Sequence, residues 1–208
     1  LKEKLAELKM GSLGLDLPTG HTPYTKQFRG ISPQTLKQFG AFYTNQVEKL
    51  QDRIIFPVKD ITGKIVVFVA RHTLSNGNPR YINYPSGVTM PVFPAHLPSG
   101  YQSMVIVEGV FYMLNLYDKG LENVICAFGT NTLQNETAQK LLPFKAQGVT
   151  HIYILFDGDD AGAQAAKNIK PLIEQEGFIV EIITLPDGTD PGELDQFDVK
   201  SIAEYITK

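Results

Sequence analysis

The second half of the chain alternates continuous apolar runs with segments of helical periodicity. Such apolar runs are typical of strands that are buried on both faces of a sheet. They occupy residues 104–107, 124–128, 151–156 and 178–183. The segments between and after them predict helices at about 110–117, 134–142, 160–175 and 199–206. Strands that alternate with helices indicate an α/β fold, with a mostly parallel sheet flanked by helices.

The first hundred residues have a different pattern, with short strands and many Pro and Gly residues. The apolar-rich runs 53–59 and 64–71 flank a polar turn at 60–63 that ends in Gly, which predicts a β-hairpin. A further short strand is expected at 80–84, after a turn rich in Asn, Gly and Pro. This part therefore predicts a smaller, strand-rich, mixed α+β subdomain.

These patterns divide the chain into three parts. Residues 1–27 are expected to form an N-terminal helix, at 1–10, and a linker rich in Gly, Pro, Ser and Thr. The strand-rich subdomain follows over 28–100, where Ser32 caps a short helix that Pro33 starts and Gly40 ends. The α/β domain occupies 101–208.

Composition sets the broad class of the protein. The 208 residues are 43% hydrophobic and 20% charged, which is ordinary for a globular chain and argues against disorder. No apolar run is long enough to cross a membrane, and the charged N-terminus does not resemble a secretion signal. The single cysteine, Cys126, excludes an intramolecular disulfide and favours the reducing cytoplasm. Because the sequence starts at Leu1, a fragment of a longer protein is one expectation.

The net charge of −3 hides an uneven distribution along the chain. Residues 29–100 carry eight Lys or Arg and three acidic residues, whereas 101–208 carry seven Lys and sixteen acidic residues. A basic part joined to an acidic part suggests two different roles, of which the basic one fits phosphate binding.

Acidic residues follow three of the four expected parallel strands. Glu108 follows the first strand, Asp157, Asp159 and Asp160 follow the third, and Asp187 and Asp190 follow the fourth. Functional sites of parallel sheets gather at this edge, and converging carboxylates need a cation to offset their repulsion. Oxygen ligands suit Mg²⁺ or Mn²⁺, and such a site favours phosphoryl or nucleotidyl transfer.

Each of these acidic residues also has a simpler interpretation. Asp160 stands before a helix, where an N-cap is about three times as plausible as a ligand. Asp187-Gly188 is typical of a turn, and Asp157 and Asp159 taken alone are equally compatible with an ordinary loop. It is the coincidence of all three groups with strand ends that favours a metal site.

Specific motifs carry a resemblance to a known family. Glu108-Gly109, the Asp-Gly-Asp-Asp-Ala-Gly sequence at 157–162 and the Leu-Pro-Asp-Gly-Thr-Asp-Pro sequence at 185–191 resemble, in order and spacing, the TOPRIM domain of bacterial DnaG-type primases. The segment at 127–130 fits the Leu-Gly-Thr segment of that family. Upstream, 52–60 and 79–83 resemble the basic subdomain that precedes TOPRIM in these primases.

The resemblance implies roles for individual residues. The divalent metal, Mg²⁺ or Mn²⁺, would be held by Asp157 and Asp159 together with Glu108 and Asp190, and Glu108 would also assist the chemistry. Template, primer or nucleoside triphosphate would be contacted by Arg53, Arg71, Arg80, Tyr81 and Asn83. Without the motifs, an ordinary solvated surface would be the preferred interpretation of these arginines.

The chain also departs from the family pattern. Tyr112 stands where the family usually has an Asp four residues after the Glu, and Gly192 replaces the second acid of an Asp-Pro-Asp sequence. A family lysine is replaced within 93–95, and the four His residues have no metal-ligand spacing. Tyr112 thus stands in place of one possible ligand of a second metal ion, and Gly192 removes another acid.

The sequence therefore predicts a primase catalytic core, a DNA-directed RNA polymerase that makes short RNA primers on single-stranded DNA from NTPs. A replicative helicase and a zinc-binding domain outside this chain are expected partners. Two alternatives stay open: a catalytically weakened TOPRIM module that only binds nucleic acid, and a TOPRIM nuclease.

Overall fold

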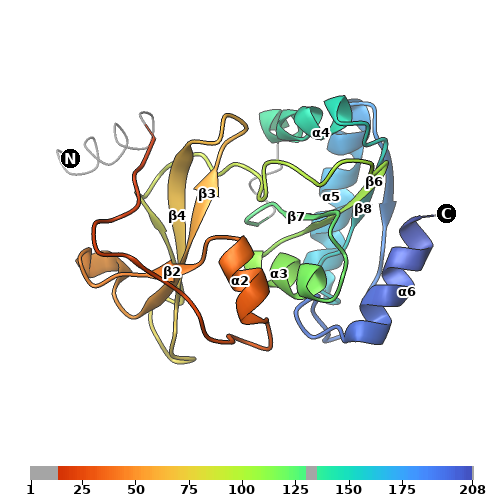
Figure 1. The fold of residues 1–208 in the computed structure, drawn as a ribbon. Coiled ribbons are helices and arrows are strands. Elements are labelled where there is room, and N and C mark those ends of the chain that lie inside the picture. Colours follow the sequence, from red (N-terminus) through yellow and green to blue (C-terminus); the bar gives the residue numbers. More distant parts are fainter. Residues whose placement is uncertain (1–13, 130–134, 208) are drawn as a thin grey trace. The chain divides into compact units, whose positions relative to one another are not determined.

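The structure is a computed structural model that describes residues 14–129 and 135–207. The chain divides into two compact units, Leu1–Met90 and Pro91–Lys208, which are described one at a time (Figure 1). The helix expected at 1–10 and Thr130 of the Leu-Gly-Thr-like segment lie outside the described residues. Among the described residues, no helix combines the length and the apolar character needed to span a membrane.

The first unit is built on a five-stranded sheet in the order β1-β2-β3-β4-β5, and all of its neighbouring strands are antiparallel (Figure 1). Its strands are β1 (Thr22–Pro23), β2 (Phe42–Tyr43), β3 (Arg53–Lys59), β4 (Ile65–His72) and β5 (Tyr81–Tyr84). The predicted hairpin is confirmed as β3 and β4, and the Asp60 side chain accepts hydrogen bonds from the backbone N–H groups of Thr62 and Lys64 in its turn. Gly63 adopts the positive φ of 84° that this turn requires.

Short helices complete the first unit. They are α2 (Pro33–Gln38) and the single 3₁₀ turn η1 (Glu48–Leu50). The predicted cap of α2 is confirmed, because Oγ of Ser32 accepts a hydrogen bond from the backbone N–H of Thr35. One face of the sheet packs into a core that includes Phe42, Ile55 and Phe68. This core holds β2, β3 and β4 in register.

The second unit contains the predicted parallel sheet, with four strands in the order β7-β6-β8-β9. Its strands are β6 (Ser103–Val107), β7 (Val124–Cys126), β8 (His151–Ile154) and β9 (Ile179–Ile182). The longer helices are α3 (Val110–Asp118), α5 (Asp160–Gln175) and α6 (Gln196–Ile206). Strands and helices alternate along the chain, so the α/β fold class is confirmed.

Helices cover both faces of this sheet. Ile152 and Ile154 of β8 belong to a core that also contains Ile169 and Ile173 of α5. Tyr153 points to the opposite face, since side chains alternate along a strand, and its ring packs edge to face against Tyr205 of α6 at 5.8 Å. The unit is therefore a three-layer sandwich in which α5 and α6 lie on opposite sides (Figure 1).

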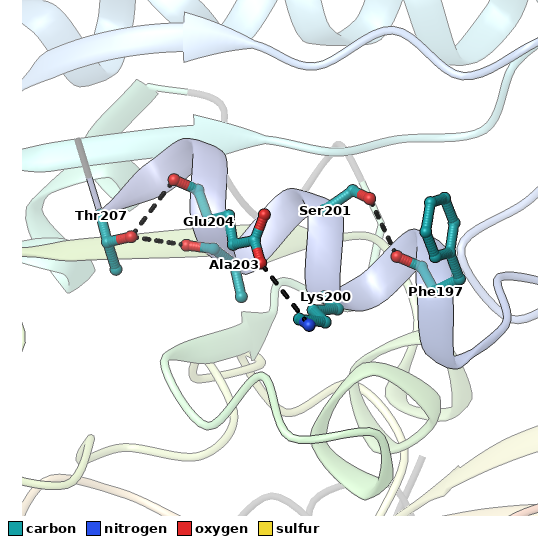
Figure 2. A network of polar contacts seen from close by, with 6 residues as sticks. All are labelled: Phe197, Lys200, Ser201, Ala203, Glu204 and Thr207. Carbon is teal, nitrogen blue, oxygen red and sulfur yellow. Dashed lines mark hydrogen bonds and ion pairs between the residues drawn. The ribbon is translucent and has the colours of Figure 1, made fainter.

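The contacts drawn in Figure 2 stay within α6 and its C-cap residue Thr207. Nζ of Lys200 lies 3.8 Å from Oε1 of Glu204, and the hydroxyl of Ser201 donates to the carbonyl of Phe197. Asp195 caps the helix in a reciprocal capping box with Asp198. These local contacts stabilise α6 without engaging the rest of the unit.

The segment predicted as one helix at 134–142 differs in the structure. Its described part forms a 3₁₀ helix, η3 (Asn135–Leu141), which is followed by a short α4 (Leu142–Ala146). Pro143 has no N–H to donate to the preceding turn, so one continuous α-helical hydrogen-bond ladder cannot pass this position. At the edge of β7, Phe93 exchanges two backbone hydrogen bonds with Cys126.

Candidate active site

The acidic residues predicted from the sequence gather at one edge of the parallel sheet. Glu108 directly follows β6, Asp157 and Asp159 follow β8, and Asp190 lies in the loop after β9. We call these four residues the acidic edge. Parallel strands end at the same edge, which brings the four together from three separate segments.

Backbone hydrogen bonds hold the loop after β9 against the loop after β8. The N–H of Gly158 donates to the carbonyl of Thr189 at 2.8 Å, and the N–H of Gly188 donates back to the carbonyl of Gly158 at 3.0 Å. Gly188 has a φ of 76°, so the predicted turn at Asp187-Gly188 is confirmed. The two loops, and the aspartates they carry, are thus fixed relative to each other.

Helix α3 fixes the other side of the loop that carries Asp190. The side-chain amide of Asn115, which is 3% exposed, donates to the carbonyls of Pro191 and Leu194 at 2.9 and 3.1 Å. Asp190 in turn accepts a hydrogen bond at Oδ1 from the N–H of Gly192 at 2.7 Å. One buried amide therefore anchors the loop, and a local turn orients the Asp190 carboxylate.

Close backbone contacts explain two glycines of the Asp-Gly-Asp-Asp-Ala-Gly motif. A Cβ at Gly158 would lie 2.2 Å from the carbonyl oxygen of Pro186, and a Cβ at Gly162 would lie 2.3 Å from the carbonyl oxygen of Asp157. Atoms do not approach this closely, so only glycine fits at either position without a backbone shift. The motif keeps the loops and the start of α5 packed tightly around Asp157.

Asp159 has a structural role that the sequence analysis gave to its neighbour. Its Oδ1 accepts a hydrogen bond from the N–H of Gly162 at 2.7 Å and caps α5. The expectation that Asp160 is the cap is wrong, because Asp160 is already the first residue of the helix. Asp159 has the extended backbone of an N-cap, with φ −125° and ψ 172°. One oxygen of Asp159 is therefore committed to the helix.

Asp157 has one carboxylate oxygen that is buried. Its Oδ2 accepts a hydrogen bond from the hydroxyl of Tyr112 at 3.2 Å. Its Oδ1 is buried and has no hydrogen-bond partner among the described residues. A buried carboxylate oxygen without a donor costs free energy unless a cation or water satisfies it.

The carboxylates act on one another electrostatically. Burial raises the pKa of Glu108 above its usual range, and the negative charges of Asp157 and Asp159 raise it further. Burial also raises the pKa of Asp157, as do the charges of Asp190 and Asp159, whereas the hydrogen bond from Tyr112 opposes that rise. The negative charges of the four carboxylates therefore repel one another.

This arrangement fits a divalent cation, although no three His, Cys, Asp or Glu side chains among residues 14–129 and 135–207 already enclose an ion position. The fit rests on the unpartnered Oδ1 of Asp157 and on a donor set made only of hard oxygen atoms. A cavity of about 650 Å³ adjoins the site, with Asp157, Asp159 and Lys167 among its lining residues. It offers room for a ligand beside the cation.

The basic residues predicted to contact nucleic acid lie in the first unit, on β3, β4 and around β5. Arg71 is directly opposite Tyr81 and Val69 is opposite Asn83 in the register of β4 and β5. Arg71, Tyr81 and Asn83 therefore share one face of the sheet, and Arg71 Nη1 donates to the Tyr81 hydroxyl.

Arg53 does not join that face. It is opposite His72 in the β3–β4 register, so its side chain leaves the sheet on the other side from Arg71. Arg53 is 7% exposed, its Nη2 donates to the carbonyl of Pro79 at 2.9 Å, and its Nη1 has no partner among the described residues. The structure therefore separates Arg53 from Arg71, Tyr81 and Asn83.

Two residues of these sites were not predicted as site residues. Burial lowers the pKa of Arg71, and the positive charges of Arg29 and Arg80 contribute to that lowering, so Arg29 belongs to the same basic cluster as Arg71. Tyr112 was noted only as a departure from the family, yet it contacts Asp157. The signal was its position four residues after Glu108, which is one helical turn.

Comparison with known proteins finds a matching family model for each of the two units. Residues 17–93 match the family model described as "DNA primase catalytic core, N-terminal domain", and residues 105–195 match the one described as "Toprim-like". A DNA primase of Aquifex aeolicus is 34% identical over 149 residues, which cover 68% of this chain and 29% of that protein. The chain thus spans less than a third of that relative's length.

Solved structures agree with this match. The structure of the Aquifex aeolicus primase with its zinc-binding and RNA polymerase domains has a TM-score of 0.70 and 26% identity, covering 86% of this chain and 53% of that one. The primase fragment of the bacteriophage T7 primase-helicase protein has a TM-score of 0.68 and 21% identity, covering 90% of this chain and 75% of that one. The second likeness bears on the fold alone.

The two matched domains, in this order, define the class of protein as a primase catalytic core. Within that class, the chain is a DnaG-type primase segment, in which the N-terminal domain of the catalytic core is followed by a TOPRIM domain.

Proposed function

We propose that this chain is the catalytic core of a primase that synthesises short RNA primers on single-stranded DNA by metal-dependent nucleotidyl transfer. The observation that carries the proposal is the acidic edge, where four carboxylates repel one another around the unpartnered Oδ1 of Asp157. The match of both units to primase domains gives this edge its chemical context.

Mg²⁺ or Mn²⁺ would be held by Asp157 and Asp159, with Glu108 and Asp190 completing the negative site. When bound, the ion would supply charge stabilisation for the triphosphate during nucleotidyl transfer. The residues themselves orient the site: Tyr112 holds Oδ2 of Asp157, and the α5 cap holds Oδ1 of Asp159. Because its pKa is raised, Glu108 would accept or return a proton during the reaction.

The first unit would bind the nucleic acid and the nucleoside triphosphate. Arg71 and Tyr81 offer a cation and an aromatic ring on one sheet face, with the Arg71 guanidinium 4.9 Å from the ring centroid. Asn83 lies on the same face, and Arg80, which is exposed, precedes β5. Arg53 lies on the other face and donates to the carbonyl of Pro79, so we propose that it acts on this surface only indirectly, through Pro79.

Partners and setting follow from the relatives. A zinc-binding domain accompanies the polymerase domain in the Aquifex aeolicus structure, and the T7 fragment belongs to a primase-helicase protein. We therefore propose a zinc-binding domain and a replicative helicase as partners of this chain. We also propose that it works in the cytoplasm, where a buried free thiol such as Cys126 stays reduced.

A primer-synthesis assay on single-stranded templates, with labelled NTPs and either Mg²⁺ or Mn²⁺, tests the proposal. We expect wild type to make primers, and we expect Asp157→Asn and Asp159→Asn to lose at least a hundredfold in rate. The matched control is Glu204→Gln, which removes an exposed carboxylate on α6 (Figure 2) and should leave the rate unchanged. Undiminished synthesis by both aspartate variants would contradict the proposal.

A second candidate function is a module that binds nucleic acid but has weakened chemistry. The observation that favours it is Tyr112, a neutral side chain that occupies one oxygen of Asp157 within the acidic edge. This candidate predicts weak uptake of Mn²⁺ and no primers in the same assay. Calorimetric Mn²⁺ binding that Asp157→Ala abolishes would exclude it, and cleavage of labelled DNA would point instead to a nuclease.

A further inference from the structure

Tyr112 lies in the first turn of α3, among the carboxylates of the acidic edge. Its hydroxyl donates to Oδ2 of Asp157 at 3.2 Å. The phenol is therefore an uncharged side chain that donates a hydrogen bond to a carboxylate of the acidic edge.

The ring of Tyr112 also fills space beside the loop that carries Asp190. A Cβ at Gly192 would lie 3.1 Å from Cδ1 of Tyr112 and 2.9 Å from Oδ1 of Asp190. Both distances are tighter than ordinary van der Waals contact, so a larger residue at 192 would press on the ring and on the carboxylate. Tyr112 and Gly192, the two positions where the family has an acid, thus pack against each other.

Hydrogen bonds already engage three carboxylate oxygens of the acidic edge. They are Oδ2 of Asp157, Oδ1 of Asp159 and Oδ1 of Asp190. Two-metal sites hold their ions about 3.5–4 Å apart, which favours a carboxylate that offers one oxygen to each ion. Oδ2 of Asp157 keeps a lone pair beside the bond from Tyr112, but the phenol hydroxyl at 3.2 Å competes with a second ion for that oxygen. Oδ1 has no donor among the described residues and is the oxygen that a first ion would use.

We propose that Tyr112 is a positioning residue that limits the acidic edge to a single divalent cation. It does so by holding Oδ2 of Asp157 and by filling the space beside Gly192 that a second ion and its ligands would need. This inference rests on the proposed function, because it takes the acidic edge to be a metal site.

Counting bound Mn²⁺ by electron paramagnetic resonance, with affinities from calorimetry, tests the inference without relying on activity. Tyr112→Phe removes the hydroxyl but keeps the ring, whereas Tyr112→Asp adds a carboxylate and removes the ring. The matched control is Tyr205→Phe. Tyr205, on α6, also donates to a carboxylate, that of Glu181 at 2.8 Å, but neither residue belongs to the acidic edge.

Wild type and Tyr205→Phe should each bind one Mn²⁺ with equal affinity. Tyr112→Phe should still bind one ion, about tenfold or more weakly, since loss of a hydrogen bond that orients a ligand has effects of this size. Tyr112→Asp should bind two ions, and a folded Tyr112→Asp protein that binds only one would overturn the inference. If it does not fold, Tyr112→Ala, which removes both the hydroxyl and the ring, should bind the second ion instead.

Two ions on wild type, or an unchanged affinity in Tyr112→Phe, would overturn the inference. Primer synthesis by a wild type that holds two ions would overturn the inference alone and leave the proposed function standing. A wild type that binds no Mn²⁺ at the acidic edge would overturn both.

Discussion

Replacing Gly162 by Ala tests how tightly the start of α5 is packed against the loop that carries Asp157. The added Cβ would lie 2.3 Å from the carbonyl oxygen of Asp157 and 3.0 Å from its nitrogen. The first distance is about 1 Å short of ordinary contact, and both atoms are backbone, so no side-chain rotation relieves the clash. Overpacking of this kind costs roughly 1–3 kcal/mol.

The higher helix propensity of Ala acts against the clash. Ala is favoured over Gly within helices by about 1 kcal/mol, so a Gly162 in open surroundings would be stabilised by the substitution. We expect the clash to exceed this gain, and the free energy of unfolding to fall by up to about 2 kcal/mol.

Urea unfolding followed by circular dichroism measures the stability of Gly162→Ala, and calorimetry measures its Mn²⁺ affinity. Because the substitution displaces Asp157 and the N–H that binds Asp159, metal affinity should fall as well. Gly109→Ala is the control for stability, since the three atoms nearest to its added Cβ are Tyr112 carbons at 3.6 Å or more. A Gly162→Ala protein that is as stable as wild type, with unchanged affinity, would refute the packing argument.

Three further predictions concern other parts of the molecule. Asp195→Ala should lower the thermal midpoint by removing the cap of α6. The backbone N–H groups of Asp198 and Phe197 lower the pKa of Asp195, so the cap stabilises the fold above the usual aspartate pKa and loses this effect as the pH falls. Thermal melts at falling pH should therefore show the midpoints of wild type and variant converging. Cys126 is fully buried and burial raises its pKa, so a thiol reagent should leave it unmodified in the native protein and label it on unfolding; rapid native labelling would contradict its burial. Arg71→Gln should weaken binding to single-stranded DNA and reduce the slope of log affinity against log salt by about 1, whereas an unchanged slope in a fluorescence-anisotropy titration would show that Arg71 contacts no phosphate.

Much of the fold could be predicted from local patterns. Strand β3 (Arg53–Lys59) and helix α5 (Asp160–Gln175) have the predicted bounds, because apolar runs, capping residues and terminating glycines are local features that can be recognised in the sequence. The interrupted helix at 135–146 was not predicted, since apolar spacing carries no information about where the hydrogen-bond ladder breaks.

The candidate site could be predicted at the level of strand ends but not of individual atoms. Two adjacent aspartates precede α5, and only the backbone conformation shows that Asp159, rather than Asp160, is the cap. The separation of Arg53 from Arg71 depends on the register of β3 against β4, and a shift of one residue would reverse it. The bond from Tyr112 to Asp157 joins residues 45 positions apart, beyond the reach of local patterns.

Anomalous diffraction from crystals soaked in Mn²⁺ would show whether the acidic edge binds a divalent cation. We expect an anomalous peak at the acidic edge, at a coordination distance of roughly 2.1 Å from Oδ1 of Asp157. A soaked crystal with no peak at this edge, or with peaks only elsewhere on the protein, would contradict the assignment of Glu108, Asp157, Asp159 and Asp190 as a metal site.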